Sequence, residues 1–314
     1  MQKIKDLKWE PGITVNDFVR GLTSVGFQGT EAGKAVDVIL KMKKSGSKIF
    51  LTFTSNMVTS GLRGLFAQLI KLKLVDVIIT TVGSVEEDIM RAKGESFLVS
   101  SFYSDDLSLH ERGMNRVGNI LVPNESYCNF EDEINVILDE IYKKQQKFAV
   151  SELLREIGSK LNDEDSILYQ AYKNNVPVFC PAITDGAFGF HLYLFQQKHN
   201  DFSVDIIKDF ENILFSTSYD EKKGLIALGG GVSKHHALLA NLLNGGLDYA
   251  VYITTEHQSS GSMSGATTQE AKSWGKIKDD SDAATIHGEV SIIFPLVIFR
   301  VLESLNKENL LKNG

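Results

Sequence analysis

The stretch "GLIALGGGVSKHHALLANL", residues 224–242, runs from an apolar segment into an amphipathic one through three consecutive glycines. Its first seven residues, "GLIALGG" (224–230), are typical of a β-strand that is buried on both faces. Glycines at such a bend let the backbone approach a ligand closely, and the start of the following helix favours an anion. The spacing is neither G-x-G-x-x-G nor a P-loop, because Lys234 follows no G-x-x-x-x-G-K-[ST] frame. The stretch therefore predicts a strand, a turn and a helix, with either a dinucleotide site or a plain tight turn at the bend.

Similar apolar runs recur along the chain. They are "KIFLTF" (48–53), "VDVIITT" (75–81), "VPVFCPAI" (176–183) and "YAVYITT" (249–255). Because these runs are continuous rather than alternating, they indicate strands of a parallel sheet that is covered on both sides.

Amphipathic helices are predicted between the strands. One has the apolar stripe Leu62, Leu65, Phe66, Leu69 and Ile70. A second opens with the acidic "FEDE" (130–133) and closes at the basic "KKQQK" (143–147), and its stripe is Ile134, Val136, Ile137, Leu138 and Ile141. Alternating strands and helices predict an α/β fold, with a doubly wound, mainly parallel sheet and helices on both faces.

Composition narrows the class of protein. The 314 residues contain five prolines and no low-complexity tract, so we expect one domain that spans residues 1–314. A net charge of −7 argues against a nucleic-acid binder. Two cysteines, Cys128 and Cys180, are expected to be buried small hydrophobic residues, and the histidine spacing predicts no metal site. The start has no signal-peptide pattern, and the longest apolar run, "SIIFPLVIF" (291–299), is too short to span a membrane, so we expect a cytoplasmic protein.

Small and polar residues dominate the segments that follow the predicted strands. These segments are residues 54–56, 81–88, 184–190, 229–236 and 254–266. In doubly wound sheets the ligand lies at the carboxyl ends of the strands. Turn chemistry explains any single loop, but five such loops together predict a nucleotide pocket.

Lys276, in "AKSWGKI" (271–277), lies directly after Trp274 and Gly275. A lysine amine that is held against an aromatic ring loses water, and desolvation favours its neutral, nucleophilic form. The alternative is a lysine at a strand end whose stem simply covers the ring.

Other candidates come from two short polar clusters. His235 and His236 lie in the first turn of the helix after the glycines, where one of them could be a general base or a surface residue. Glu86, Glu87 and Asp88 follow a strand and open a helix, so they either complement the helix dipole or bind an ammonium group or a ribose. Glu270, six residues before Lys276, is a similar candidate.

Taken together, these segments resemble the deoxyhypusine synthase family. The matching stretches are "GFQGTEAGKAV", "TSNMVTSGLR", "VDVIITTVGSVEED", "NRVGNILVPNESYCNFED", "NNVPVFCPAITDG", "LGGGVSKHHALLANL", "DYAVYITT", "SGSMSGA" and "EAKSWGKI". They follow the family order over nearly the whole chain. The resemblance implies a Rossmann-like NAD-binding fold, a homotetramer, and Lys276 as the covalent nucleophile of the "SWGK" motif.

The implied reaction begins when NAD removes a hydride from the carbon beside a secondary amine of spermidine. The lysine captures the resulting imine and diaminopropane leaves. A second amine then takes the aminobutyl group from the lysine, and NADH returns the hydride. The acceptor is a lysine of the translation factor 5A precursor, or a free diamine in homospermidine-forming relatives.

The resemblance also implies residue roles. His235 is the proton acceptor beside Lys276. The substrate contacts are Glu86, Glu87, Gly261, Ser262, Met263, Glu270, Trp274 and the position of Phe190. The NAD contacts are Ser55, Asn56, Thr81, Val82, Gly83, Glu87, Asp185, Gly230, Thr255, Glu256, Ser264 and Glu289.

Several positions depart from the family pattern. Phe190, Ser260 and Met263 stand where the family usually has aspartates, and Leu239 replaces an asparagine. Lost carboxylates remove charge-assisted contacts to a multiply charged amine, so we expect a donor other than spermidine with fewer charges. Two alternatives remain open: a homospermidine synthase type that uses free diamines, and a non-catalytic NAD-binding relative.

Overall fold

The computed structural model describes residues 3–311, which form two compact units. Unit 1 consists of Met1–Phe53, Leu72–Ile79 and Ile213–Gly314, and unit 2 consists of Thr54–Lys71 and Thr80–Asn212. Each unit is therefore assembled from segments that are far apart in the sequence. The expectation of one domain across residues 1–314 stays a prediction.

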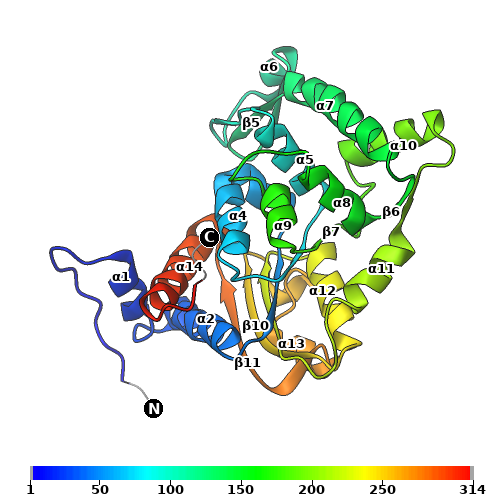
Figure 1. Cartoon of the computed structure of the whole chain (residues 1–314). Helices are drawn as coiled ribbons and strands as arrows, with labels where there is room; N and C mark the ends of the chain where they lie inside the picture. The colour runs from blue at the N-terminus through cyan, green and yellow to red at the C-terminus, as the bar shows by residue number, and fades with distance from the viewer. Residues whose placement is uncertain (1–2, 312–314) are drawn as a thin grey trace. The chain divides into compact units, whose positions relative to one another are not determined.

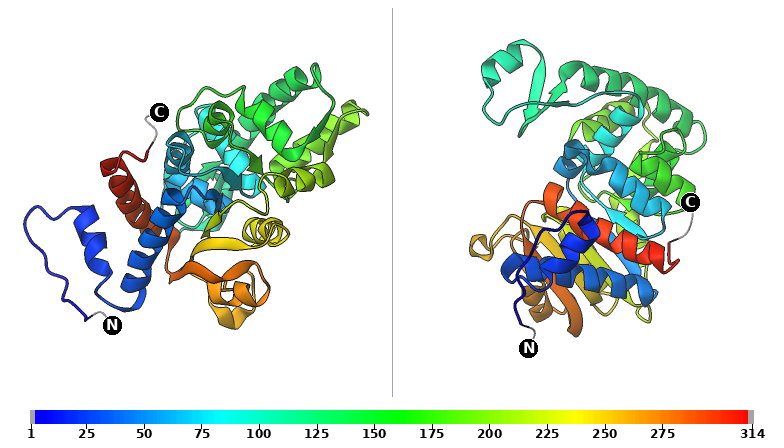
Figure 2. Two further views of the ribbon diagram at one scale, coloured as in Figure 1. Left: turned by 60° about the horizontal axis from the view of Figure 1, so that its bottom comes forward. Right: turned by 90° about the vertical axis from the view of Figure 1, so that its left-hand side faces the viewer.

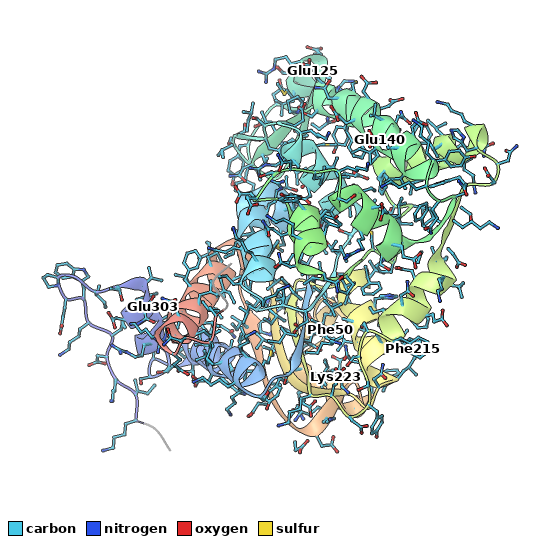
Figure 3. The ribbon with its side chains drawn as sticks, viewed as in Figure 1. Phe50, Glu125, Glu140, Phe215, Lys223 and Glu303 are labelled. Atoms are coloured by element: carbon cyan, nitrogen blue, oxygen red, sulfur yellow. The ribbon has the colours of Figure 1, made fainter. Side chains whose placement is uncertain are left out.

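Unit 1 is built on parallel strands. They are β1 (Lys48–Thr52), β2 (Val77–Ile79), β9 (Lys223–Leu228), β10 (Leu247–Thr254) and β11 (Ile277–His287). Their order is β11-β10-β9-β1-β2, and all neighbours in this series pair in parallel. Phe50, labelled among these strands in Figure 3, has no exposed surface, as its continuous apolar run predicts.

Helices cover this sheet on both faces. They are α1 (Val15–Leu22), α2 (Phe27–Lys44), α12 (Val232–Leu242), α13 (Thr268–Ser273) and α14 (Val290–Lys307). A Cβ at Gly224 of β9 would lie 2.7 Å from Met42 of α2, so Gly224 faces that helix. Gly224 pairs with Tyr249 of β10, and Tyr252, three residues further on, must point to the opposite face. There the Lys234 Nζ of α12 lies 4.0 Å from the centroid of the Tyr252 ring. The predicted doubly wound α/β fold is confirmed.

The N-terminal and C-terminal helices of unit 1 lie together. α14 packs against α1 and α2, as the red and blue helices of Figure 2 show. On the strands, α13 packs against β10 and β11, near the bottom of Figure 1.

Strand β11 was not predicted. Its sequence, "IKDDSDAATIH", contains three aspartates and carries no continuous apolar run. It is last in the strand order, and Asp279, Asp280 and Asp282 are exposed. A strand at this position needs few apolar side chains, so the pattern of a buried strand is absent.

Unit 2 holds the remaining elements. The helices are α3 (Ser55–Met57), η1 (Val58–Leu62), α4 (Arg63–Lys71), α5 (Val82–Ala92), α6 (Asp106–Glu111), α7 (Asn124–Tyr142), α8 (Val150–Gly158), α9 (Ile167–Asn174), α10 (Ala187–Lys198) and most of α11 (Ile206–Leu214). The strands are β3 (Leu98–Val99), β4 (Met114–Val117), β5 (Ile120–Pro123), β6 (Lys147–Ala149), β7 (Val178–Phe179) and β8 (Ser203–Asp205). β3, β5 and β4 form a small antiparallel sheet, and β6 pairs with β8 in parallel.

Helix α7 corrects two sequence predictions. It begins at Asn124, directly after Pro123, rather than at "FEDE", because proline provides a favourable entry to a helix. Its buried stripe includes Ser126, Phe130 and Ile134. Val136 and Cys128 lie off this stripe and are exposed, so the predicted burial of both was wrong. Cys180 is buried, as predicted.

Two further expectations concern metals and membranes. Among residues 3–311, no cluster of three or more His, Cys, Asp or Glu side chains could hold a metal ion. No helix in that range is both long enough and apolar enough to cross a bilayer.

Candidate active site

Lys276 lines a cavity of about 270 Å³ in unit 1. The wall contains His235 and Lys234 from the start of α12, Tyr252 from β10, the loop around Met263, and Glu270 and Trp274 from α13 and its end. The remaining lining residues are Leu238, Gly261, Ser262, Ala266, Thr267 and Ala271. The structure thus brings together most of the residues that the sequence assigned to Lys276 chemistry.

The end of α13 determines where Lys276 lies. Gly275 adopts a φ of +67°, a left-handed conformation that favours glycine, and the helix stops there. The Lys276 N–H then donates to the Ala271 carbonyl at 3.1 Å, and the Lys276 carbonyl accepts from Leu247 at 3.0 Å. Lys276 therefore directly precedes β11, at the amino end of that strand. Lys276 is thus outside the loops that follow the strands, because α13 returns the chain to the start of β11.

The Lys276 side chain is buried against an aromatic ring. Only 7% of the residue is exposed, and Nζ lies 5.1 Å from the centroid of the Trp274 ring. Trp274 itself is 67% exposed, so the ring separates the amine from solvent on one side.

Only one of the two neighbouring histidines lines the cavity. His235 does so, and its pKa is lowered by burial and by the nearby Lys276. Burial and His235 lower the pKa of the neighbouring His236 to about 4. A helix directs adjacent side chains about 100° apart, which explains the difference.

Lys234 is the charged lining residue that the sequence interpretation missed; the other lining residues it did not assign are Leu238, Tyr252, Ala266, Thr267 and Ala271. It is completely buried, and its Nζ donates to the carbonyls of Met263 at 2.9 Å and Ala266 at 2.8 Å. One signal could have found it: Lys234 shares the buried face of α12 with Leu238 and Asn241.

Glu270 and the loop before α13 complete the cavity. Thr267 caps α13 by accepting from the Glu270 N–H at 3.2 Å, which orients the first turn. Glu270 is exposed and is the only carboxylate among the described lining residues. Met263, by contrast, adds a thioether to the wall, and Leu239 is not among the lining residues.

The predicted NAD-contacting residues fall in both units. In unit 1, Gly230 follows β9, and a Cβ there would lie 2.2 Å from the Ser264 Cα, so the two loops meet too closely for a side chain. Thr255 and Glu256 follow β10. Glu289 caps α14 by accepting from Ser291 and Ile292 N–H groups at 3.0 and 3.2 Å.

In unit 2, the segments that follow β1 and β2 lie together. The Ser55 N–H donates to the Thr81 hydroxyl at 3.0 Å, and a Cβ on Gly83 would lie 2.8 Å from that of Ser55. Asn56 is exposed and Val82 is buried. Asp185, before α10, is exposed.

The three acidic residues of α5 do not open the helix. They lie beyond its first turn and are buried, so a favourable contact with the helix N-terminus does not explain them. Glu86 accepts from the Phe188 N–H at 2.8 Å, and burial raises its pKa. Glu87 lies 2.6 and 2.8 Å from the Thr59 hydroxyl, and burial raises its pKa to about 7.

Asp88, in contrast, is held by an ion pair and by backbone hydrogen bonds. It accepts from Arg63 Nε at 2.6 Å and from the Ile167 and Leu168 N–H groups at the start of α9. Phe190, another predicted substrate contact, lies on α10 in unit 2 and is 57% exposed.

Comparisons with known proteins identify the family. The family model described as "Deoxyhypusine synthase" matches residues 17–301. A Schizosaccharomyces pombe protein named "Probable deoxyhypusine synthase" is 41% identical over 305 residues, which cover 92% of this chain and 87% of that protein. The Kluyveromyces lactis protein named "Deoxyhypusine synthase" is 37% identical over 327 residues, which cover 90% of this chain and 86% of that one.

Among solved structures, one is titled "Crystal Structure of a putative deoxyhypusine synthase from Entamoeba histolytica". It superimposes with a TM-score of 0.68 at 28% identity and covers 96% of this chain and 97% of its own. The predicted resemblance is therefore confirmed, and the chain belongs to the deoxyhypusine synthase family.

Proposed function

We propose that this protein is an NAD-dependent aminoalkyl transferase. It takes an aminobutyl-type group from an amine donor, holds it as an imine on Lys276, and passes it to an acceptor amine. Family membership supports the reaction type. The observation that carries the proposal is the buried Lys276 amine in a cavity that also contains Trp274 and His235.

The residues around Lys276 suit this chemistry. A lysine amine attacks carbon to form an imine, and the Lys276 amine is buried with its Nζ 5.1 Å from the centroid of the Trp274 ring. His235 has a lowered pKa, so it is neutral at pH 7 and can accept the proton of the donor amine. Glu270 supplies one carboxylate for a substrate ammonium group.

We propose that NAD is held by the loops at Gly230, Thr255 and Ser264 of unit 1. A Cβ at Gly230 would lie 2.2 Å from the Ser264 Cα, so the absence of a side chain lets these two loops pack directly against each other. When bound there, NAD would supply the hydride acceptor, and later the hydride donor, that the reaction needs. Glu289 needs its carboxylate for the α14 cap, so we expect its contribution to NAD binding to be small.

We further propose that the donor carries fewer charges than spermidine. Met263, Leu238, Ala266 and Ala271 give the cavity an apolar wall, and Glu270 is its only carboxylate among the described residues. The acceptor is either a protein lysine, such as that of the translation factor 5A precursor, or a free diamine. We propose a cytoplasmic location and, as the family resemblance implies, a homotetramer. Light scattering coupled to gel filtration tests the oligomeric state.

The test is trapping of the covalent intermediate. The protein is incubated with NAD and a panel of di- and triamines, reduced with borohydride, and analysed by intact mass and peptide mapping. We expect an adduct on Lys276 whose mass identifies the transferred group. Lys276→Arg should abolish the adduct and retain NAD binding, whereas Lys272→Arg, on the exposed side of α13, should leave it unchanged.

Other outcomes are equally informative. NAD binding without an adduct for any amine would favour a non-catalytic NAD-binding protein. Transfer from the loaded enzyme to putrescine would indicate the homospermidine synthase type, and transfer to the factor 5A precursor would indicate a protein acceptor. Loss of NAD binding in Lys276→Arg would show that this lysine is structural.

A further inference from the structure

His257 and His287 form a stacked pair of rings in unit 1. The centroids of the two imidazole rings lie 5.4 Å apart, and the ring planes differ by only 8°, which is the offset-stacked arrangement of flat π-systems. Among residues 3–311, neither ring makes a hydrogen bond or an ion pair, and the buried His287 Nδ1 has no partner. Packing of the rings, and not hydrogen bonding, therefore holds this pair.

The pair lies at the carboxyl ends of two adjacent strands. His287 is the last residue of β11, and it pairs in register with Thr254, the last residue of β10. His257 follows Thr254 by three residues. The His287 N–H donates to Gln28 Oε1 at 2.8 Å, which ties the end of β11 to the start of α2. In doubly wound sheets, ligands bind beyond this end of the strands.

Part of the pair is open to solvent. His257 is exposed and His287 is half-buried, so His287 supports the His257 ring while aromatic surface remains for a planar ligand. Nucleic bases stack on such surfaces because each base has a π-face. Glu256, directly before His257, is also exposed, and in dinucleotide folds a carboxylate hydrogen-bonds the ribose. The local chemistry therefore suits a flat ring that carries a ribose.

The position of the pair relative to Lys276 decides which ring of a dinucleotide it meets. Neither histidine lines the Lys276 cavity. Along β10, the backbone runs about 23 Å from Leu247, the partner of Ile277, to Thr254, at about 3.3 Å per residue. The ring that exchanges hydride has to lie beside the amine donor in the cavity. The adenine ring is therefore the one that is left for the histidine pair.

One loop joins the pair to the cavity. It begins at His257 and contributes Gly261, Ser262 and Met263 to the cavity wall. We propose that the His257–His287 pair is the stacking platform for the adenine ring of the dinucleotide, with His257 as the contacting ring and His287 as its support. This inference rests on the proposed function, because it takes NAD as the ligand.

The test compares the two halves of the dinucleotide by isothermal titration calorimetry on the full-length chain at pH 8. The probes are NAD, ADP, which carries the adenine ring, and nicotinamide mononucleotide, which does not. His257→Ala should weaken binding of NAD and ADP about five- to thirtyfold, as expected when one stacked base loses its partner, and should leave binding of nicotinamide mononucleotide unchanged. His257→Phe keeps a flat ring and should bind ADP within about threefold of wild type.

Further variants separate stacking from a change in the loop. Gln258→Ala alters the next exposed residue of the same loop and should bind all three probes as wild type does. His287→Ala removes only the support, so it should weaken ADP binding less than His257→Ala does. Circular dichroism shows whether each variant folds, and His257→Gln replaces the alanine variant if that one does not.

Unchanged ADP binding in His257→Ala, or an equal loss in His257→Phe, would overturn the proposal. An equal loss of nicotinamide mononucleotide binding would also overturn it, because the whole loop would then be disturbed. If NAD binding follows His257 but the trapping experiment yields no adduct, only the proposed aminoalkyl transfer fails. If adducts form and NAD affinity ignores both histidines, only the present inference fails. A wild-type protein that binds neither NAD nor ADP would overturn both.

Discussion

Replacing Asp88 with asparagine should destabilise unit 2 strongly. The Asp88 carboxylate is 1% exposed and accepts from four donors: Arg63 Nε at 2.6 Å, the Ser166 hydroxyl at 2.9 Å, and the N–H groups of Ile167 at 3.0 Å and Leu168 at 2.8 Å. Each carboxylate oxygen accepts from two of these donors. Whichever oxygen is replaced by the NH₂ group of asparagine, two donors would then point at another donor.

The magnitude follows from these contacts. Breaking a buried ion pair by removing one partner typically costs about 3–5 kcal/mol, because the other charge stays buried. Arg63 keeps a second partner, Asp163 at 2.6 Å, which offsets part of this loss. We therefore expect Asp88→Asn to reduce the free energy of unfolding by about 3 kcal/mol. Asp163→Asn is the matched control, and since Asp163 is 26% exposed we expect a loss of about 1 kcal/mol.

The assay is urea unfolding followed by far-UV circular dichroism at one protein concentration and pH 7. A loss below about 1 kcal/mol for Asp88→Asn would refute the reasoning, because an ion pair this deeply buried cannot be replaced by a neutral amide at so small a cost. An equal loss of unfolding free energy in both variants would show that the Asp88 contacts stabilise the fold no more than the Arg63–Asp163 pair does. Either result would also reopen Asp88 as a candidate site residue.

Three further predictions concern the candidate site. Burial raises the folded-state pKa of Glu87 to about 7 from 4.5, so ionisation opposes folding, and stability should fall as pH rises from about 4.5 to above 7. Glu87→Gln should remove this dependence and unfold at a higher urea concentration than wild type at pH 8; an unchanged pH profile would contradict the assignment. His235→Asn should slow adduct formation about 100-fold with little effect on NAD affinity, while His236→Asn should affect stability more than rate. Met263→Asp, alone and with Phe190→Asp, should improve adduct formation from spermidine in the trapping assay, and no gain in either would refute the proposed donor preference.

Local patterns were sufficient for much of the fold. The apolar runs that contain Phe50 and Ile78 are strands because continuous burial on two faces requires such residues. Strand β11 escaped prediction since its aspartates face solvent at the last position of the strand series. The start of α7 was misplaced because charge order was weighed above Pro123.

Within the candidate site, the sequence identified the residue types but not their environments. The "SWGK" motif indicated Lys276, and the resemblance extended this to His235 and Glu270. The sequence could not show that Lys234 is completely buried beside these residues, because α12 and the 261–266 loop meet only in the folded chain. Glu87 shows the same limit: its raised pKa arises from burial on α5 and contact with Thr59, 28 residues earlier.

By itself, the sequence determined the α/β class, the family and the lysine on which the proposed chemistry depends, because periodicity and motifs are properties of neighbouring residues. The tertiary structure alone decided that Lys276 lies at the amino end of β11, that Asp88 pairs with Arg63 while Glu86 and Glu87 are buried on the same helix, and that two lysines line one cavity. Charge states depend on burial and on groups brought together from distant segments, and only the folded chain establishes either.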